Sequence, residues 1–133
     1  MKATHLILSL ILAGGFAQAN AQAPATGNFR CGGVGIDQST QMKADAAKHD
    51  IFLTFAVAST GAYLSDVDID IRDAKGAQVA AGKCSGPMLL ADVPAAGTYK
   101  VTATYKGVAR QQTVTVGKSG KGAGAGQTLT WAE

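Results

Sequence analysis

Hydrophobic and polar residues alternate along most of the chain after residue 50. In the segment 67–71 (VDIDI), the apolar side chains fall on one face and the carboxylates on the other, which is the period of a β-strand. The segment 98–105 (TYKVTATY) alternates in the same way, with Tyr99, Val101, Ala103 and Tyr105 predicted to point inward. Strands of this kind predict sheets with one face in a core and the other in water.

The segment 51–58 (IFLTFAVA) predicts a more deeply buried strand. Ile51, Leu53, Phe55 and Val57 share one face, while Phe52 and Ala56 make the other face partly apolar. Further strands are predicted at residues 77–84, 88–93, 110–117 and 127–131, with Gly- and Pro-containing turns between them. About seven short strands of this spacing predict a mainly β protein, an antiparallel β-sandwich of immunoglobulin-like or transthyretin-like type.

One short helix is predicted before the strands, from about Thr40 to Lys48. Asp37 or Ser39 can cap it by accepting a hydrogen bond from a free backbone N–H group. Met42, Ala46 and His49 form a thin stripe that is expected to pack on one side of a sheet.

These patterns predict one domain. Residues 22–35 form an N-terminal segment, with a polar lead-in followed by a flexible turn at 31–35. Residues 36–117 hold the helix and the sandwich, residues 118–126 form a Gly-rich loop, and residues 127–133 contribute a final strand.

The N-terminus has the three regions of a secretory signal peptide. Lys2 provides a positive charge, residues 6–13 are apolar, and residues 14–23 are small or polar apart from one phenylalanine. The site Ala19-Asn20-Ala21 predicts cleavage after Ala21, so residues 1–21 form the leader. The apolar run is shorter than the roughly 20 residues of a spanning helix, and we expect no transmembrane segment in the mature chain. The protein is therefore expected to be periplasmic or secreted.

Two cysteines, Cys31 and Cys84, remain after the leader is removed. In an oxidising compartment an even number of cysteines indicates a disulfide, and closing the loop between them would contribute roughly 4 kcal/mol. The alternative is two reduced thiols, because sequence alone does not show whether the two Cα atoms come within bonding range.

The formal net charge is +3, and Lys2 in the leader contributes one of these charges. Beyond residue 93 the chain is basic, with Lys118 and Lys121 in the Gly-rich stretch and Glu133 as its one acid. This tail has two interpretations, contact with an anionic phospholipid or lipopolysaccharide surface, or a solvated loop. No nucleic-acid partner is expected.

Two stretches carry a resemblance to a known family. Residues 64–76 (LSDVDIDIRDAKG) and 90–101 (LADVPAAGTYKV) resemble the strand-and-turn motifs of the carboxypeptidase regulatory-like domain. The chain is also similar to small exported proteobacterial proteins that carry this domain, through the segments 33–35, 49–56 and 61–67. The resemblance covers roughly residues 33–117 and implies a β-sandwich fold. It implies little about function, because such sandwiches serve many roles.

The motifs of cofactor and metal sites are not completed. Lys118-Ser119 follows a glycine, but a phosphate-binding loop needs a second glycine at position 112, which is Gln112. Asp66, Asp68 and Asp70 alternate with branched residues, and an extended strand holds carboxylates in a flat row rather than around a cation. We therefore expect no cofactor and no bound metal.

The sequence also lacks the residues of a catalytic centre. His49 is the one histidine that remains after leader removal, and no G-x-S-x-G elbow is present. We therefore expect the protein not to be an enzyme, and His49 to have a capping or packing role.

Two functions from different classes remain open. The first is a non-catalytic interaction or structural module of the cell envelope that binds another envelope protein through an edge strand or loops. The second is a carbohydrate- or small-molecule-binding domain in which Tyr63, Trp131 or the aspartate face contacts the ligand. Two aromatic rings exposed in one concave patch would favour the second function.

Overall fold

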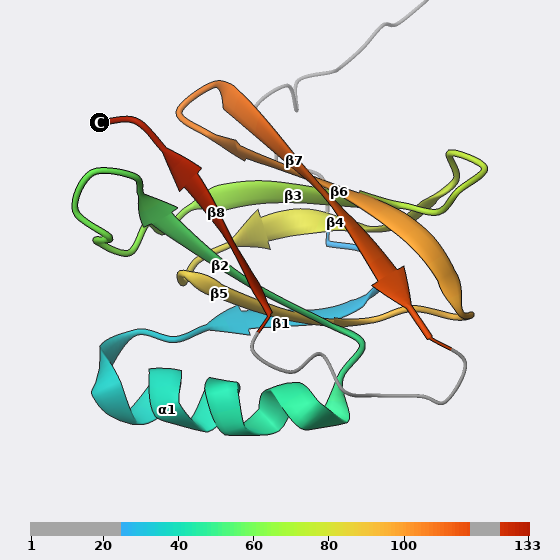
Figure 1. Ribbon diagram of the computed structural model, residues 1–133, viewed down its shortest axis with the longest axis horizontal. Helices are drawn as coiled ribbons and strands as arrows, with labels where there is room; N and C mark the ends of the chain where they lie inside the picture. The colour runs from blue at the N-terminus through green and yellow to red at the C-terminus, as the bar shows by residue number, and fades with distance from the viewer. Residues whose placement is uncertain (1–24, 118–125) are drawn as a thin grey trace, which may run out of the picture.

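Two four-stranded sheets pack face to face, and one helix lies against the outside of the first (Figure 1). The computed structural model describes residues 25–117 and 126–133. The predicted leader, and all of the predicted Gly-rich loop except Gly126, lie outside these residues. The elements, in chain order, are β1 (Asn28–Gly32), α1 (Gly35–Asp45), η2 (Ala46–Lys48), β2 (Ile51–Val57), β3 (Val67–Arg72), β4 (Gln78–Cys84), β5 (Met88–Asp92), β6 (Gly97–Tyr105), β7 (Val108–Val116) and β8 (Gln127–Trp131). The expected β-sandwich with one short helix is confirmed.

The strand order is β1-β5-β2-β8 in the first sheet and β4-β3-β6-β7 in the second. Neighbouring strands of the described residues are antiparallel, with one exception. β8 runs parallel to β2, because the chain leaves the second sheet after β7 and re-enters the first sheet beside β2.

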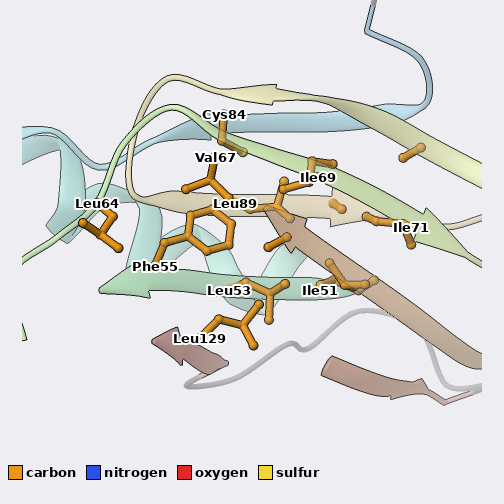
Figure 2. Packing of buried hydrophobic residues seen from close by; sticks show 14 of the residues in the cluster. Ile51, Leu53, Phe55, Leu64, Val67, Ile69, Ile71, Cys84, Leu89 and Leu129 are labelled. Atoms are coloured by element: carbon orange, nitrogen blue, oxygen red, sulfur yellow. The ribbon is translucent and has the colours of Figure 1, made fainter. Parts of the chain in front are cut away.

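The core lies between the two sheets. Figure 2 shows Ile51, Leu53 and Phe55 of β2 facing the branched side chains of β3. Val67, Ile69 and Ile71 of that strand are buried, as the alternation predicts. β4, β5, β6 and β8 add alternate side chains to this cluster, and β7 adds Val116.

A second, smaller cluster lies on the outer face of the first sheet. There Met42 of α1 and Ala46 of η2 pack against Phe52, Met88 and Leu90. This confirms Met42 and Ala46 of the predicted stripe and Phe52 of the second apolar face of β2, whereas His49 and Ala56 lie outside this cluster. Among the described residues, no helix is long and apolar enough to cross a membrane.

The N-terminal segment differs from the prediction. Residues 28–32 form β1, which pairs with β5, whereas the sequence predicted a polar lead-in and a flexible turn. The segment contains only two bulky apolar residues, Phe29 and Cys31, and both are only partly buried. A strand at the edge of a sheet needs little apolar surface, so its alternation is weak.

The helix also begins earlier than predicted. It begins at Gly35, so Asp37 and Ser39 lie inside the helix and neither caps it. Instead, the side-chain oxygen of Gln38 accepts hydrogen bonds from the backbone N–H groups of Gly33 and Val34, at 2.7 and 2.8 Å. The residue that caps this helix therefore lies within its first turns. The sequence prediction had instead assumed the usual arrangement, in which a residue just before the helix provides the cap.

The predicted disulfide is confirmed. Cys31 of β1 is bonded to Cys84 of β4, with their Cα atoms 5.2 Å apart. These strands are edges of the two different sheets, so the bond joins the sheets at one side of the sandwich. An antiparallel bridge between Thr26 and Ala81 joins the same two regions of the chain.

Candidate functional site

The first sheet has an open half on its outer face. The helix packs against Phe52, Met88 and Leu90, and no other element of residues 25–117 and 126–133 covers the outer faces of the rest of β2 and of β8. A groove of about 520 Å³ lies there, beside the helix. Its lining residues are Lys43, Phe52, Thr54, Ala56, Val57, Ala58, Gly61, Tyr63, Thr128 and Thr130.

Strand alternation and register place the floor of this groove. In β2, the side chains of Phe52, Thr54 and Ala56 point away from the core. The register of β2 and β8 sets Thr54 beside Thr128 and Ala56 beside Thr130. Three hydroxyl groups therefore lie on two adjacent strands above a floor that includes the buried side chains of Phe52 and Ala56.

Tyr63 reaches the groove because its segment pairs with the end of β2. The backbone N–H of Val57 donates to Ala62, that of Leu64 donates to Phe55, and Tyr63 forms a bridge with Ala56. A residue paired with Ala56 directs its side chain to the same face, so the phenol lies on the outer side. Tyr63 is 49% exposed and remains a candidate ligand contact.

Trp131, the other predicted ligand contact, is buried in the core, so its ring has no exposed face on which a ligand could stack. The residue is only 2% exposed, because odd-numbered residues of β8 point into the core. Its indole Nε1 donates to the carbonyl oxygen of Val108 at 2.8 Å, and the ring packs edge-to-face against Phe55 and Tyr105. Trp131 therefore closes the final strand, which was the alternative interpretation of this residue.

His49 lies in a cluster that holds two strands together. Its Nδ1 is 3.0 Å from an Asp92 carboxylate oxygen, and the other oxygen of Asp92 accepts from the backbone N–H of Asp50. The carboxylate of Asp50 in turn accepts from the backbone N–H of Val93 at 3.0 Å. These reciprocal bonds join the start of β2 to the end of β5. His49 was expected to have a capping or packing role, and it is the C-cap residue of η2, where its backbone N–H donates to the carbonyl oxygen of Ala46.

The aspartate face of the second sheet is occupied by exposed ion pairs. Asp68 lies 3.2 Å from Lys83, and Asp70 lies 2.9 Å from Arg72 and also accepts from Gln78. Exposed pairs of this kind contribute little to stability. Within residues 25–117 and 126–133, no group of three His, Cys, Asp or Glu side chains is arranged to hold a metal ion.

Lys43, Thr54, Thr128 and Thr130 were not predicted as site residues. The alternation of 51–58 and 127–131 shows that the threonines point away from the core. It does not show that the two strands are adjacent, and this adjacency is what creates the groove.

No protein-family model matches this chain, and no curated protein matches it. The two stretches that carry the carboxypeptidase regulatory-like resemblance span strands and the turns that adjoin them, and residues in both turns have structural roles. Asp73 accepts from the backbone N–H groups of Lys75 and Ala77, and Gly76 has a positive φ of 87°. The hydroxyl of Tyr99 donates to the carbonyl oxygen of Ala95 at 2.6 Å. These motif residues therefore shape the turns of a sandwich and lie outside the groove.

Proposed function

We propose that this protein is a non-catalytic interaction module that acts outside the bacterial cytoplasm and binds an envelope protein in the groove over β2 and β8. The observation that carries this proposal is the half-covered sheet. The helix covers one part of the outer face, and the part beside it forms a groove with hydroxyl groups, one ammonium group and one exposed phenol.

The lining chemistry supports binding. Threonine hydroxyls donate and accept hydrogen bonds, and Tyr63 combines an apolar ring with a polar end, as is common at protein interfaces. Lys43 adds a positive charge at the helix side of the groove. His49 and Asp92 contact each other at the junction of β2 and β5 and do not line this groove.

Two features support a location outside the cytoplasm. The leader pattern of residues 1–21 is one, and the disulfide between Cys31 and Cys84 is the other, since disulfides persist mainly in oxidising compartments. We expect the mature protein to begin at Gln22, which intact-mass analysis of exported material will test.

Site-specific photo-crosslinking in exporting cells tests the proposed surface. A photoreactive amino acid is placed at Thr128 in the groove and, as a matched control, at Thr102 on the outer face of the second sheet. We expect a discrete protein adduct from position 128 that is lost when Tyr63→Ala is added. Equal adducts from both positions, or an adduct that Tyr63→Ala leaves unchanged, would refute the groove as the binding surface.

A carbohydrate ligand is the second candidate, and the exposure of the Tyr63 ring favours it. Sugars stack their apolar faces on such rings, and the threonine hydroxyls could hydrogen-bond to the sugar. Soluble peptidoglycan fragments titrated against the protein would then shift NMR signals of groove residues. Tyr63→Phe should preserve the shifts and Tyr63→Ala should remove them, whereas an unperturbed groove would exclude these glycans.

A further inference from the structure

β7 is a long edge strand. It spans nine residues, pairs with β6 on one side, and no other strand of the described residues pairs with its outer side. Its pairing with β6 runs continuously from Val108 to Val116. A strand of this kind presents a row of backbone donors and acceptors to any strand that aligns with it.

The turn before β7 determines which backbone groups point outward. Lys106 and Gly107 both have positive φ, 49° and 81°, as in a two-residue hairpin turn that makes Tyr105 and Val108 a hydrogen-bonded pair. Hydrogen-bonded and non-bonded pairs alternate along an antiparallel ladder. Residues 109, 111, 113 and 115 therefore direct their N–H and C=O groups away from β6. The carbonyl oxygens of Ala109 and Thr113 accordingly accept bonds from side chains, at 3.4 and 3.3 Å.

The other sheet edges are shorter or partly covered. β1 and β8 have five residues each, and the edge of β4 is bridged at Ala81 by Thr26. β7 contains no lysine, proline or bulge, and its one guard against pairing is a single charged side chain on its inner face. Its one charged residue, Arg110, turns its Nε toward the carbonyl oxygen of Thr130 in β8.

We propose that β7 pairs with β7 of a second copy of this protein. The two strands run antiparallel about a twofold axis at Gln112 and join the two second sheets into one continuous sheet. This register overlaps all nine residues, with residue 109 opposite 115 and residue 111 opposite 113. It forms about eight backbone hydrogen bonds between the outward-facing groups.

The side chains of β7 are self-complementary in this register. On the outer face, alanine lies opposite threonine and glutamine opposite threonine, all of them uncharged. On the inner face, Val108 lies opposite Val116, Arg110 opposite Val114, and Gln112 opposite its own copy. A shift by two residues along each strand would instead place Arg110 opposite Arg110, and like charges directly opposite each other are unfavourable. The pairing would also cover Val108, which is 45% exposed in the monomer.

A charge-swap experiment tests both the dimer and its register. Analytical ultracentrifugation of the exported, oxidised protein should show a monomer–dimer equilibrium. Gln112→Lys and Gln112→Glu should each be monomeric, because like charges then meet at the twofold axis, and a mixture of the two should form a heterodimer. The same two substitutions at Gln111 are the matched control, because residue 111 lies opposite residue 113, and a mixture of those variants should show no such rescue.

A second variant separates pairing from folding. Thr113→Pro removes an outward N–H group that β6 does not use, so it should abolish the dimer and leave the circular dichroism of the monomer unchanged. Wild-type protein that stays monomeric up to about 1 mM would overturn the proposal, since a dimer with a higher dissociation constant than this would hardly form at all. A dimer that persists in Thr113→Pro, or a mixture of Gln112 variants that fails to associate, would also overturn it. The groove lies on the other sheet, so these outcomes leave the proposed function to its own test.

Discussion

Removing the disulfide is the most direct perturbation of this fold. The bond joins Cys31 of β1 to Cys84 of β4 and closes a loop with a sequence separation of 53 residues. Cys84 is buried and pairs with Val67 in the ladder between β4 and β3, whereas Cys31 is only partly buried. The double variant Cys31→Ala/Cys84→Ala removes the bond while the small side chains remain compatible with both strands.

The expected loss follows from the loop length. Cross-linking a loop of about 54 residues lowers the entropy of the unfolded chain by an amount worth about 4 kcal/mol at 25 °C. Small domains have total stabilities of about 5–15 kcal/mol, so this loss is between about a quarter and about four fifths of the wild-type stability. For a domain of about 100 residues this loss corresponds to a decrease in Tm of about 20 °C.

Thermal and urea unfolding, followed by circular dichroism, provide the measurement. The oxidised wild-type protein should lose about 4 kcal/mol on addition of reductant, and the double variant should match the reduced protein and not respond to reductant. A double variant that melts within about 3 °C of the oxidised protein would refute the reasoning, because the loop closure would then contribute less than about 1 kcal/mol.

Three further perturbations test individual contacts. Trp131→Phe removes the bond to Val108 and part of the core volume, and urea unfolding should show a loss of about 1–3 kcal/mol; no loss would mean that the indole is not a core residue. Arg30 donates a hydrogen bond to Asp45 and holds the pKa of that carboxyl below its usual 3.8, so Arg30→Gln should raise this pKa in an NMR titration. The lowered pKa stabilises the fold above pH 3.8, and this contribution disappears as the pH falls through the lowered pKa. The difference in unfolding free energy between wild type and Arg30→Gln should therefore shrink in acid, and a difference that stays constant with pH would contradict the assignment. Gly27 has a φ of +90°, and an added Cβ would lie 2.5 Å from β4, so Gly27→Ala should destabilise the protein by more than the roughly 1–2 kcal/mol of a positive φ alone, and a smaller loss in urea would show that the segment moves aside.

The location of these contacts shows how far the sequence could predict the site. Tyr63 was predicted as a ligand contact and is exposed at the groove, whereas Trp131 was predicted alongside it and is buried. Trp131 alternates with two threonines and shares the inward face of its strand with Leu129, whereas Tyr63 lies in a loop without such alternation. The face on which Tyr63 lies depends on how its segment pairs with Ala56.

The sequence by itself determined the β-sandwich, seven of its strands and most of its core. Alternation with a period of two is a local property, because a strand between water and a core must place every second side chain inward. The cysteine pair could also be anticipated from the even number of cysteines and the predicted export, although not from geometry.

Only the tertiary structure decided which strands are neighbours. β1 has too little apolar surface to be recognised alone, and it is a strand because β5 provides its backbone partners. The groove exists because β8 returns beside β2 in parallel, which brings Thr54 and Thr128 together from positions far apart in the chain. The edge of β7 is likewise open because of its position in the strand order. Register and strand order depend on contacts between distant segments, and no local pattern of side chains specifies them.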